Sequence, residues 1–252
     1  MVGPSIQTDI FVHALIETIV RREAELISGE LIIEGRLIDA SNATLYGVIK
    51  NSIEDQFAVV YKPIAGERPL WDFPEGNLAS REVAAFLVSK EVGFNCVPTT
   101  VLRDGPFGVG AVQEWIEIKD DTDVIAIAQS KARAIRNMAL FDVVINNTDR
   151  KFGHILPVDD TTILGCDHGV AFHEEFKLRT VIWQFAGEEL NETERHQIEN
   201  LNRWLENAGR DILISFLTDA EITAMRKRII QLLQTGFPYP SQDWPAIPWP
   251  PV

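Results

Sequence analysis

The chain changes character near its middle, from short strand-like segments to long helical ones, and this change constrains the fold more than any other feature. Three segments rich in β-branched and aromatic residues, 31–38, 44–49 and 57–62, are separated by clusters of turn-forming residues. Two more strand-like segments, VPTTVLR and VGAVQEWIEI, flank the turn DGPFG. We therefore expect the first half to form an antiparallel sheet of neighbouring strands.

Helical periodicity occurs once after the first three strands and then dominates the second half. The run LASREVAAFLVSKEVG predicts one helix that ends at Gly93, because glycine readily adopts the left-handed conformation found after a helix. The run SKARAIRNMALFDVVIN predicts a second helix. Asn191 with Glu194 and Thr218 with Glu221 have the spacing of capping boxes, which predicts where two later helices begin.

These patterns predict an α+β protein with two lobes joined by a single connection near Glu114 and Trp115. The final segment is too rich in proline for a helix or a central strand, so we expect an extended tail packed through Trp244 and Trp249. The predicted segments are an N-terminal helix, a lobe of antiparallel sheet with one helix, a mainly helical lobe and the proline-rich tail, over residues 1–29, 30–115, 116–236 and 237–252.

Composition narrows the classes of partner. The net charge of −14 and the lack of any long run of Lys and Arg make nucleic acid an unlikely partner. Cys96 and Cys166 are too few for a disulfide framework, and we expect both to be core thiols in a reducing compartment. The sequence has no apolar stretch long enough for a transmembrane segment and no signal-peptide pattern, so we expect a cytoplasmic protein.

The order of a sheet lobe, one connection and a helical lobe suggests a protein-kinase-like, ATP-dependent phosphotransferase. Such an enzyme needs a cation on the nucleotide phosphates and carboxylates that hold a metal ion. Lys62 ends the third strand, where its ammonium group would reach the phosphates, and Glu82 on the following helix would pair with it. A solvated surface position is the competing interpretation for each residue.

Asp149 and Asp167 are the strongest pair of candidates. Asp149 begins DRKFGH directly after a long helix, and Asp167 begins DHG after a short strand hairpin. Asp149 would orient the substrate hydroxyl, and Asp167 would bind magnesium with His154 nearby. The alternative is that both aspartates only stabilise turns through Asx hydrogen bonds.

The segments DRKFGH and CDHG resemble the DRxxxN catalytic loop and the DFG-type metal motif of the phosphatidylinositol 3/4-kinase-related superfamily, which includes HipA-like kinases. In more detail, YKPIAGERPLWDFPEGNLASREVAAFLVS, VPTTVLRDGPFGVGAVQEWI and ALFDVVINNTDRKFGH resemble a family of uncharacterised phosphatidylinositol 3/4-kinase-like proteins. The resemblance covers residues 31–185 and implies a two-lobed protein-kinase-like fold that uses ATP with Mg²⁺, or Mn²⁺ in its place.

The resemblance also implies roles for individual residues. Lys62 matches the lysine on the nucleotide phosphates and Glu82 its helix partner, while Asp149 matches the catalytic aspartate and Asp167 the metal aspartate. His154 stands where the superfamily has a metal-binding asparagine. The hinge beside adenine corresponds to Glu114, Trp115 and Ile116, and the loop that meets phosphate oxygens carries Ser41 and Asn42.

Three functions remain open from the sequence. The first is transfer of the terminal phosphoryl group of ATP to an unknown hydroxyl acceptor on a protein or small molecule. A lipid acceptor fits less well, because the acidic chain lacks a basic amphipathic helix. The second is a catalytically impaired nucleotide-binding regulator. The third is a metallohydrolase that uses His154, Asp167, His168 and His173 as zinc ligands.

Overall fold

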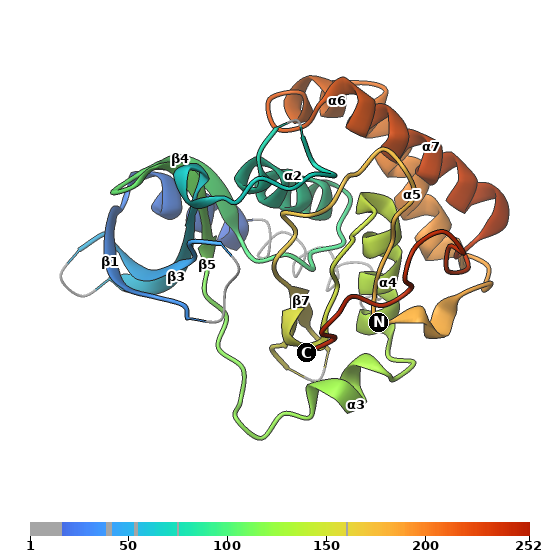
Figure 1. Ribbon diagram of the computed structural model, residues 1–252, viewed down its shortest axis with the longest axis horizontal. Coiled ribbons are helices and arrows are strands. Elements are labelled where there is room, and N and C mark those ends of the chain that lie inside the picture. The colour runs from blue at the N-terminus through green and yellow to red at the C-terminus, as the bar shows by residue number, and fades with distance from the viewer. Residues whose placement is uncertain (1–16, 39–41, 53–54, 75, 160) are drawn as a thin grey trace, which may run out of the picture. The chain divides into compact units, whose positions relative to one another are not determined.

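The computed structural model describes residues 17–38, 42–52, 55–74, 76–159 and 161–252 of the chain (Figure 1). It has an antiparallel five-stranded sheet and several helices, which confirms the predicted α+β class. The chain divides into two compact units, the first made of residues 1–66 and 99–115 and the second of residues 67–98 and 116–252.

The first unit contains the sheet and a helix over residues 17–28. Every pair of neighbouring strands is antiparallel, in the order β1-β2-β3-β5-β4 (Figure 1). The predicted strands are therefore present. Their bounds, with those of a short 3-10 turn after β3, are β1 Glu30–Arg36, β2 Leu45–Lys50, β3 Gln56–Pro63, η1 Ile64–Gly66, β4 Thr100–Gly105 and β5 Gly108–Glu114.

Tyr61 lies at the centre of the core of the first unit. Its ring is fully buried, and its hydroxyl donates a hydrogen bond to the main-chain oxygen of Gly108. A Cβ at Gly105 or Gly110 would lie 2.8 or 2.6 Å from the ring, so only glycine leaves room for it there. Because successive side chains of a strand point to opposite faces, Lys62 leaves β3 on the face opposite to Tyr61. The other core residues are Leu26, Leu31, Ile49, Val59, Val101 and Val112.

The second unit is mainly helical, with one two-stranded hairpin (Figure 1). Helix α7 contacts both α4 and α5. Its elements are α2 Leu78–Glu91, α3 Val124–Ala128, α4 Arg133–Ile145, η2 Phe152–His154, β6 Ile155–Pro157, β7 Ile163–Gly165, η3 Trp183–Phe185, α5 Glu192–Leu205, α6 Ala208–Leu213 and α7 Asp219–Thr235.

The capping boxes predicted for two helices are present. The Asn191 side chain accepts a hydrogen bond from Glu194 N, and the Glu194 carboxylate accepts one from Asn191 N, so α5 begins as expected. Thr218 and Glu221 make the same reciprocal pair at the start of α7. Gly93 follows α2 with a φ of 74°, the left-handed conformation that was predicted for it.

Helix α2 groups with the second compact unit, whereas the sequence places it in the sheet lobe. A buried ion pair accounts for this, because Arg81 of α2 lies with its Nη2 atom 2.7 Å from Oε1 of Glu221, which also caps α7. The chain consequently passes between the units three times, at 66/67, 98/99 and 115/116, and not only at the single connection expected near Trp115.

The proline-rich tail after α7 contains no helix or strand, as predicted. Its packing differs from the expectation at one of the two tryptophans. The Trp244 ring lies 4.3 Å from Lys177 Nζ, whereas Trp249 is 89% exposed and does not anchor the tail. Within the described ranges, none of the helices is both long and apolar enough to cross a bilayer.

Candidate active site

Helix α4 carries the chain to the candidate site and ends at Asn146 in the left-handed conformation, with φ 52° and ψ 55°. The buried side chain of Asn146 donates hydrogen bonds to the main-chain oxygens of His173 and Glu175, at 2.9 and 2.6 Å. Its own oxygen accepts from Lys177 N at 3.0 Å. Asn146 therefore fixes the segment after Asp167 to the end of α4.

Arg150 organises the loop that follows. Its side chain is inaccessible to solvent and forms an ion pair with Asp142 of α4, with Nη2 2.9 Å from Oδ1. Its Nη1 atom donates to the main-chain oxygens of His154 and Cys166, both at 3.1 Å. His154 immediately precedes β6 and Cys166 immediately follows β7. One guanidinium group thus ties both ends of the hairpin to α4.

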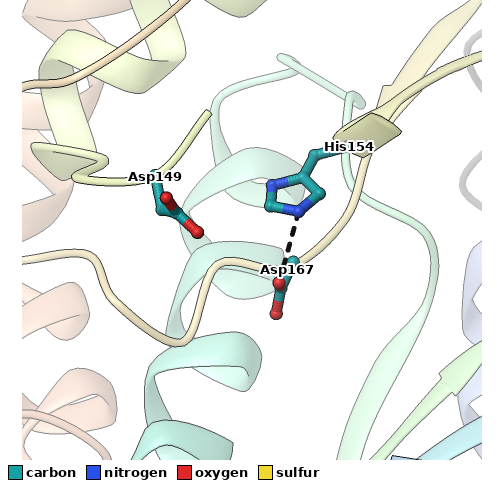
Figure 2. Close-up of side chains that lie close together, drawn as sticks. All are labelled: Asp149, His154 and Asp167. Atoms are coloured by element: carbon teal, nitrogen blue, oxygen red, sulfur yellow. Dashed lines mark ion pairs between the residues drawn. The ribbon is translucent and has the colours of Figure 1, made fainter. Parts of the chain in front are cut away.

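Asp149, His154 and Asp167 meet at the ends of this hairpin (Figure 2). One ligand atom of each side chain lies within 4.8 Å of the ligand atoms of the other two, and His154 Nε2 is 3.4 Å from Asp167 Oδ2. The His154 side chain is 15% exposed and that of Asp167 51%. Asp167 has a φ of 60°, a conformation that is uncommon outside glycine and that occurs often at functional sites.

Burial perturbs two members of this cluster. It raises the pKa of Asp149, against the opposing effect of Lys151, whose Nζ atom lies 3.2 Å from Asp149 Oδ2. Burial also lowers the pKa of His154, although the charge of Asp167 acts in the opposite direction. A neutral imidazole has a lone pair that can bind a metal ion. Two carboxylates and a neutral imidazole are therefore a donor set that fits a divalent ion.

Glu82 of α2 reaches the residue that follows Asp167. Its Oε2 atom accepts a hydrogen bond from His168 N at 3.0 Å, and the side chain is 2% exposed. The His168 ring lies between Glu82 and Arg150, with Nε2 2.7 Å from Arg150 Nη2. Because a guanidinium group only donates hydrogen bonds, Nε2 is the acceptor. The interpretation of Glu82 as a solvated surface residue is wrong, and its pairing with Lys62 stays a prediction.

The interpretation of Asp149 as a mere turn-former is not supported by the turn itself. The Asx hydrogen bond of this turn is made by Asn147, whose side-chain oxygen accepts from Asp149 N at 3.0 Å. Asn147, two residues before Asp149, therefore supplies the side-chain hydrogen bond that stabilises the turn. The carboxylate of Asp149 points towards the hairpin ends and His154 (Figure 2).

The zinc-ligand set of the metallohydrolase hypothesis is not assembled. Among the residues that the structure describes, the cluster of potential metal ligands consists of Asp149, His154 and Asp167. The Nε2 atom of His168 contacts Arg150, and that of His173 lies 3.0 Å from Lys177 Nζ. Neither histidine joins His154.

The remaining predicted residues lie mostly in the first unit. Lys62 is half-buried and pairs in register with Ala111 of β5. The boundary between the units falls between Trp115 and Ile116, inside the predicted hinge, and both Trp115 and Ile116 are accessible to solvent. Three predicted positions remain. Glu114 forms an ion pair in which its Oε1 atom lies 3.0 Å from Arg22 Nε. Asn42 is half-buried, and Ser41 lies outside the described residues.

Three residues that position the site were missed by the sequence interpretation, namely Asp142, Asn146 and Arg150. The sequence offers a signal for two of them: Asp142 is an acidic residue in the otherwise apolar stretch ALFDVVI, and Asn146 is the first of the two asparagines in NNTDR. Neither signal identifies a partner: Asp142 pairs with Arg150 only because the chain turns back after α4, and the partners of Asn146 lie 27–31 residues further along the chain.

Comparison with solved structures identifies the fold. The crystal structure of the Golgi casein kinase with Mn/ADP bound is similar to this chain with a TM-score of 0.57 at 14% identity, covering 86% of this chain and 75% of that one. The two-lobed kinase-like fold that the sequence predicted is therefore confirmed. At this identity the likeness concerns the fold alone.

Two curated proteins are similar in sequence, although no family model matches the chain. Phosphatidylinositol 4-kinase gamma 4 of Oryza sativa subsp. japonica is 26% identical over 129 residues, which cover 44% of this chain and 23% of that protein. Protein Rv2133c of Mycobacterium tuberculosis is 38% identical over 263 residues, which cover 90% of this chain and 94% of that protein. The finer assignment to a phosphatidylinositol 3/4-kinase-like or HipA-like group stays a prediction. The chain belongs to the same family as Protein Rv2133c.

Proposed function

We propose that this protein is an ATP-dependent phosphotransferase that moves the terminal phosphoryl group of ATP to a hydroxyl group with the help of a divalent metal ion. The observation that carries the proposal is the cluster of Asp149, His154 and Asp167, with ligand atoms within 4.8 Å of one another, on two loops of a kinase-like fold. Positioning and charge neutralisation supply most of the catalysis in this class of reaction, and the cluster offers both.

Asp167 and His154 would hold the metal ion, which would neutralise negative charge that develops on the transferred group. Lys62 would contact the nucleotide phosphates, and Glu82 would hold it extended. The adenine would lie beside Glu114, Trp115 and Ile116, while Ser41 and Asn42 would meet phosphate oxygens. Glu82 also fixes the backbone next to Asp167 through its hydrogen bond from His168 N.

Asp149 would orient the attacking hydroxyl and take its proton. As the hydroxyl oxygen bonds to the terminal phosphorus, the bond from that phosphorus to the bridging oxygen breaks and ADP leaves. The raised pKa of Asp149, caused by burial, makes this carboxylate a better proton acceptor than a fully solvated one. Lys151, whose Nζ atom lies 3.2 Å from Asp149 Oδ2, acts in the opposite direction on this pKa.

The acceptor is a protein or small-molecule hydroxyl in preference to a lipid. The net charge of −14 opposes binding to an anionic membrane surface, where a phosphoinositide substrate would lie. The likeness to phosphatidylinositol 4-kinase gamma 4 covers under a quarter of that enzyme and supports a shared phosphotransferase core more than a shared acceptor.

A second candidate is a nucleotide-binding regulator without turnover. The observation that favours it is His154. Mg²⁺ prefers oxygen ligands, so a nitrogen ligand lowers the affinity of the site for this ion. This candidate predicts that ATP with a metal ion raises the unfolding temperature while no phosphoryl group is released or transferred.

The test uses ATP labelled separately on the terminal and the α phosphate, with Mg²⁺ or Mn²⁺. We expect terminal label alone to appear in product or inorganic phosphate, and we expect Asp167→Ala and Lys62→Met to abolish it. Asp211→Ala and Lys227→Met are matched controls, because both residues are exposed on helices of the second unit. Equal release by Asp167→Ala and the wild type would refute the proposed site, and transfer of the α label would indicate nucleotidyl transfer.

A further inference from the structure

The C-terminal tail touches both loops of the candidate site through its main-chain oxygens. Pro251 O accepts a hydrogen bond from Phe152 N at 2.8 Å, and Phe152 lies inside the loop between Asp149 and His154. Ala246 O accepts from Thr180 N at 3.0 Å and from Trp183 Nε1 at 2.7 Å. We call residues 244–251 the C-terminal strap.

The composition of the strap suits a segment that accepts hydrogen bonds through its main chain. Four of its eight residues are proline, which carries a carbonyl but no N–H group, so this segment mainly accepts hydrogen bonds. Proline also holds the chain extended before any contact forms, which reduces the conformational entropy lost on docking. In Figure 1 the strap passes α4 and ends near the β6–β7 hairpin, in agreement with the contact at Phe152.

The donors that the strap satisfies are connected to the residues of the cluster. Phe152 begins the 3-10 turn that ends at His154. Thr180 is 3% exposed and forms a parallel bridge with Arg150, whose N donates to Arg179 O at 3.1 Å. Arg150 directly follows Asp149. The strap therefore accepts one hydrogen bond inside the catalytic loop, at Phe152, and another from Thr180, the bridge partner of Arg150.

Lys177 fastens the beginning of the strap. Its side chain is 6% exposed, and its Nζ atom lies 4.3 Å from the centre of the Trp244 ring and 5.5 Å from that of Trp71. The same atom is 3.0 Å from His173 Nε2, on the segment that Asn146 fixes to α4. An ammonium group over an aromatic face is attracted by the ring quadrupole, more strongly when it is partly desolvated.

We propose that the C-terminal strap is a positioning element of the active site, which holds the Phe152 and Thr180 main chains so that Asp149 lies beside the metal ion that His154 and Asp167 hold. The proposal rests on the metal site proposed above. The positioning contacts are the Pro251 carbonyl, the Ala246 carbonyl and the Lys177–Trp244 pair.

The test compares the wild-type chain with three variants by Mn²⁺ titration calorimetry without nucleotide. Deletion of residues 250–252 removes the acceptor for Phe152 N, and deletion of Val252 alone is the matched control, because Val252 is 68% exposed. Trp183→Phe keeps an aromatic ring but removes the donor to Ala246 O. We expect the three-residue deletion to weaken Mn²⁺ binding about tenfold, Trp183→Phe to weaken it less, and the single deletion to leave it unchanged.

Hydrogen exchange supplies a readout that a general loss of stability would not reproduce. In the three-residue deletion, amides of residues 149–154 should exchange faster while those of α5 and α7 keep their protection. Unchanged Mn²⁺ affinity in this deletion, with wild-type protein that does bind Mn²⁺, would overturn the positioning role alone. Wild-type protein that binds no Mn²⁺ would overturn the metal site and the positioning role together.

Discussion

Arg150 and Asp142 form an ion pair that is completely inaccessible to solvent, with Nη2 of the arginine 2.9 Å from Oδ1 of the aspartate. Burial by itself would lower the pKa of Arg150, but the charge of Asp142 raises it, and the net shift is upward. Arg150 Nη1 also donates to His154 O and Cys166 O. The pair thus connects α4 to both loops that carry the candidate metal ligands.

Replacing Arg150 with methionine is expected to destabilise the protein strongly. The change leaves Asp142 as an uncompensated buried charge, and breaking such a pair costs about 3–5 kcal/mol of the free energy of unfolding. Urea denaturation at pH 7 measures this loss. Arg226→Met is the matched control, since its pair with Glu206 is on the surface, and it should cost less than about 1 kcal/mol. A loss at Arg150 no larger than at Arg226 would contradict the structural role.

His154→Asn is expected to change which metal ion the protein prefers. An asparagine oxygen suits Mg²⁺, whereas an imidazole nitrogen favours first-row transition ions such as Mn²⁺. Calorimetric titration should show that the ratio of Mn²⁺ to Mg²⁺ affinity falls in the variant. His196→Asn, at an exposed position of α5, should leave the ratio unchanged. The same ratio in wild type and His154→Asn would mean that His154 is not a ligand.

The two cysteines should differ in reactivity towards a thiol reagent. Cys96 is 2% exposed, and burial raises its pKa to about 12, so almost no thiolate is present at pH 8. Cys166 is only half-buried. We expect labelling at Cys166 first, with Cys96 modified only as urea unfolds the protein, and Cys166→Ser should remove the early phase. Peptide mass spectrometry that finds early modification at Cys96 would disprove this order.

Thr218→Ala should cost about 1 kcal/mol of stability, because it removes the acceptor for Glu221 N at the start of α7. Thr218→Ser keeps the hydroxyl and should stay within a few tenths of a kcal/mol of wild type. Urea denaturation of the three proteins compares them directly. Equal loss in both variants would show that the methyl group of Thr218, and not the cap, carries the effect.

Local signals in the sequence predict much of the fold. Asn191 with Glu194 and Thr218 with Glu221 are three residues apart, so their capping boxes depend only on neighbouring backbone. Gly93 is predictable for the same reason, since one residue alone decides the left-handed turn after α2. The five strands were found because turn-forming clusters separate them in the chain.

Long-range contacts explain what the sequence did not predict. Helix α2 joins the second unit through Arg81 and Glu221, which are 140 residues apart. The sequence around Lys177 gives no sign that Trp244 of the tail packs against its ammonium group. Asp149 and Asp167 were predictable as a pair because they flank one short hairpin. Arg150, which holds that hairpin, was not, because no sequence pattern records its contacts with the main-chain oxygens of His154 and Cys166 or with the His168 ring.

The central claim is that His154 and Asp167 bind one metal ion beside Asp149 and the nucleotide. A crystal grown with Mn²⁺ and a non-hydrolysable ATP analogue, measured at the manganese absorption edge, tests it directly. The account predicts an anomalous peak in direct coordination contact with His154 Nε2 and with a carboxylate oxygen of Asp167, adjacent to the phosphates. A nucleotide bound with no manganese peak among these three side chains would contradict it.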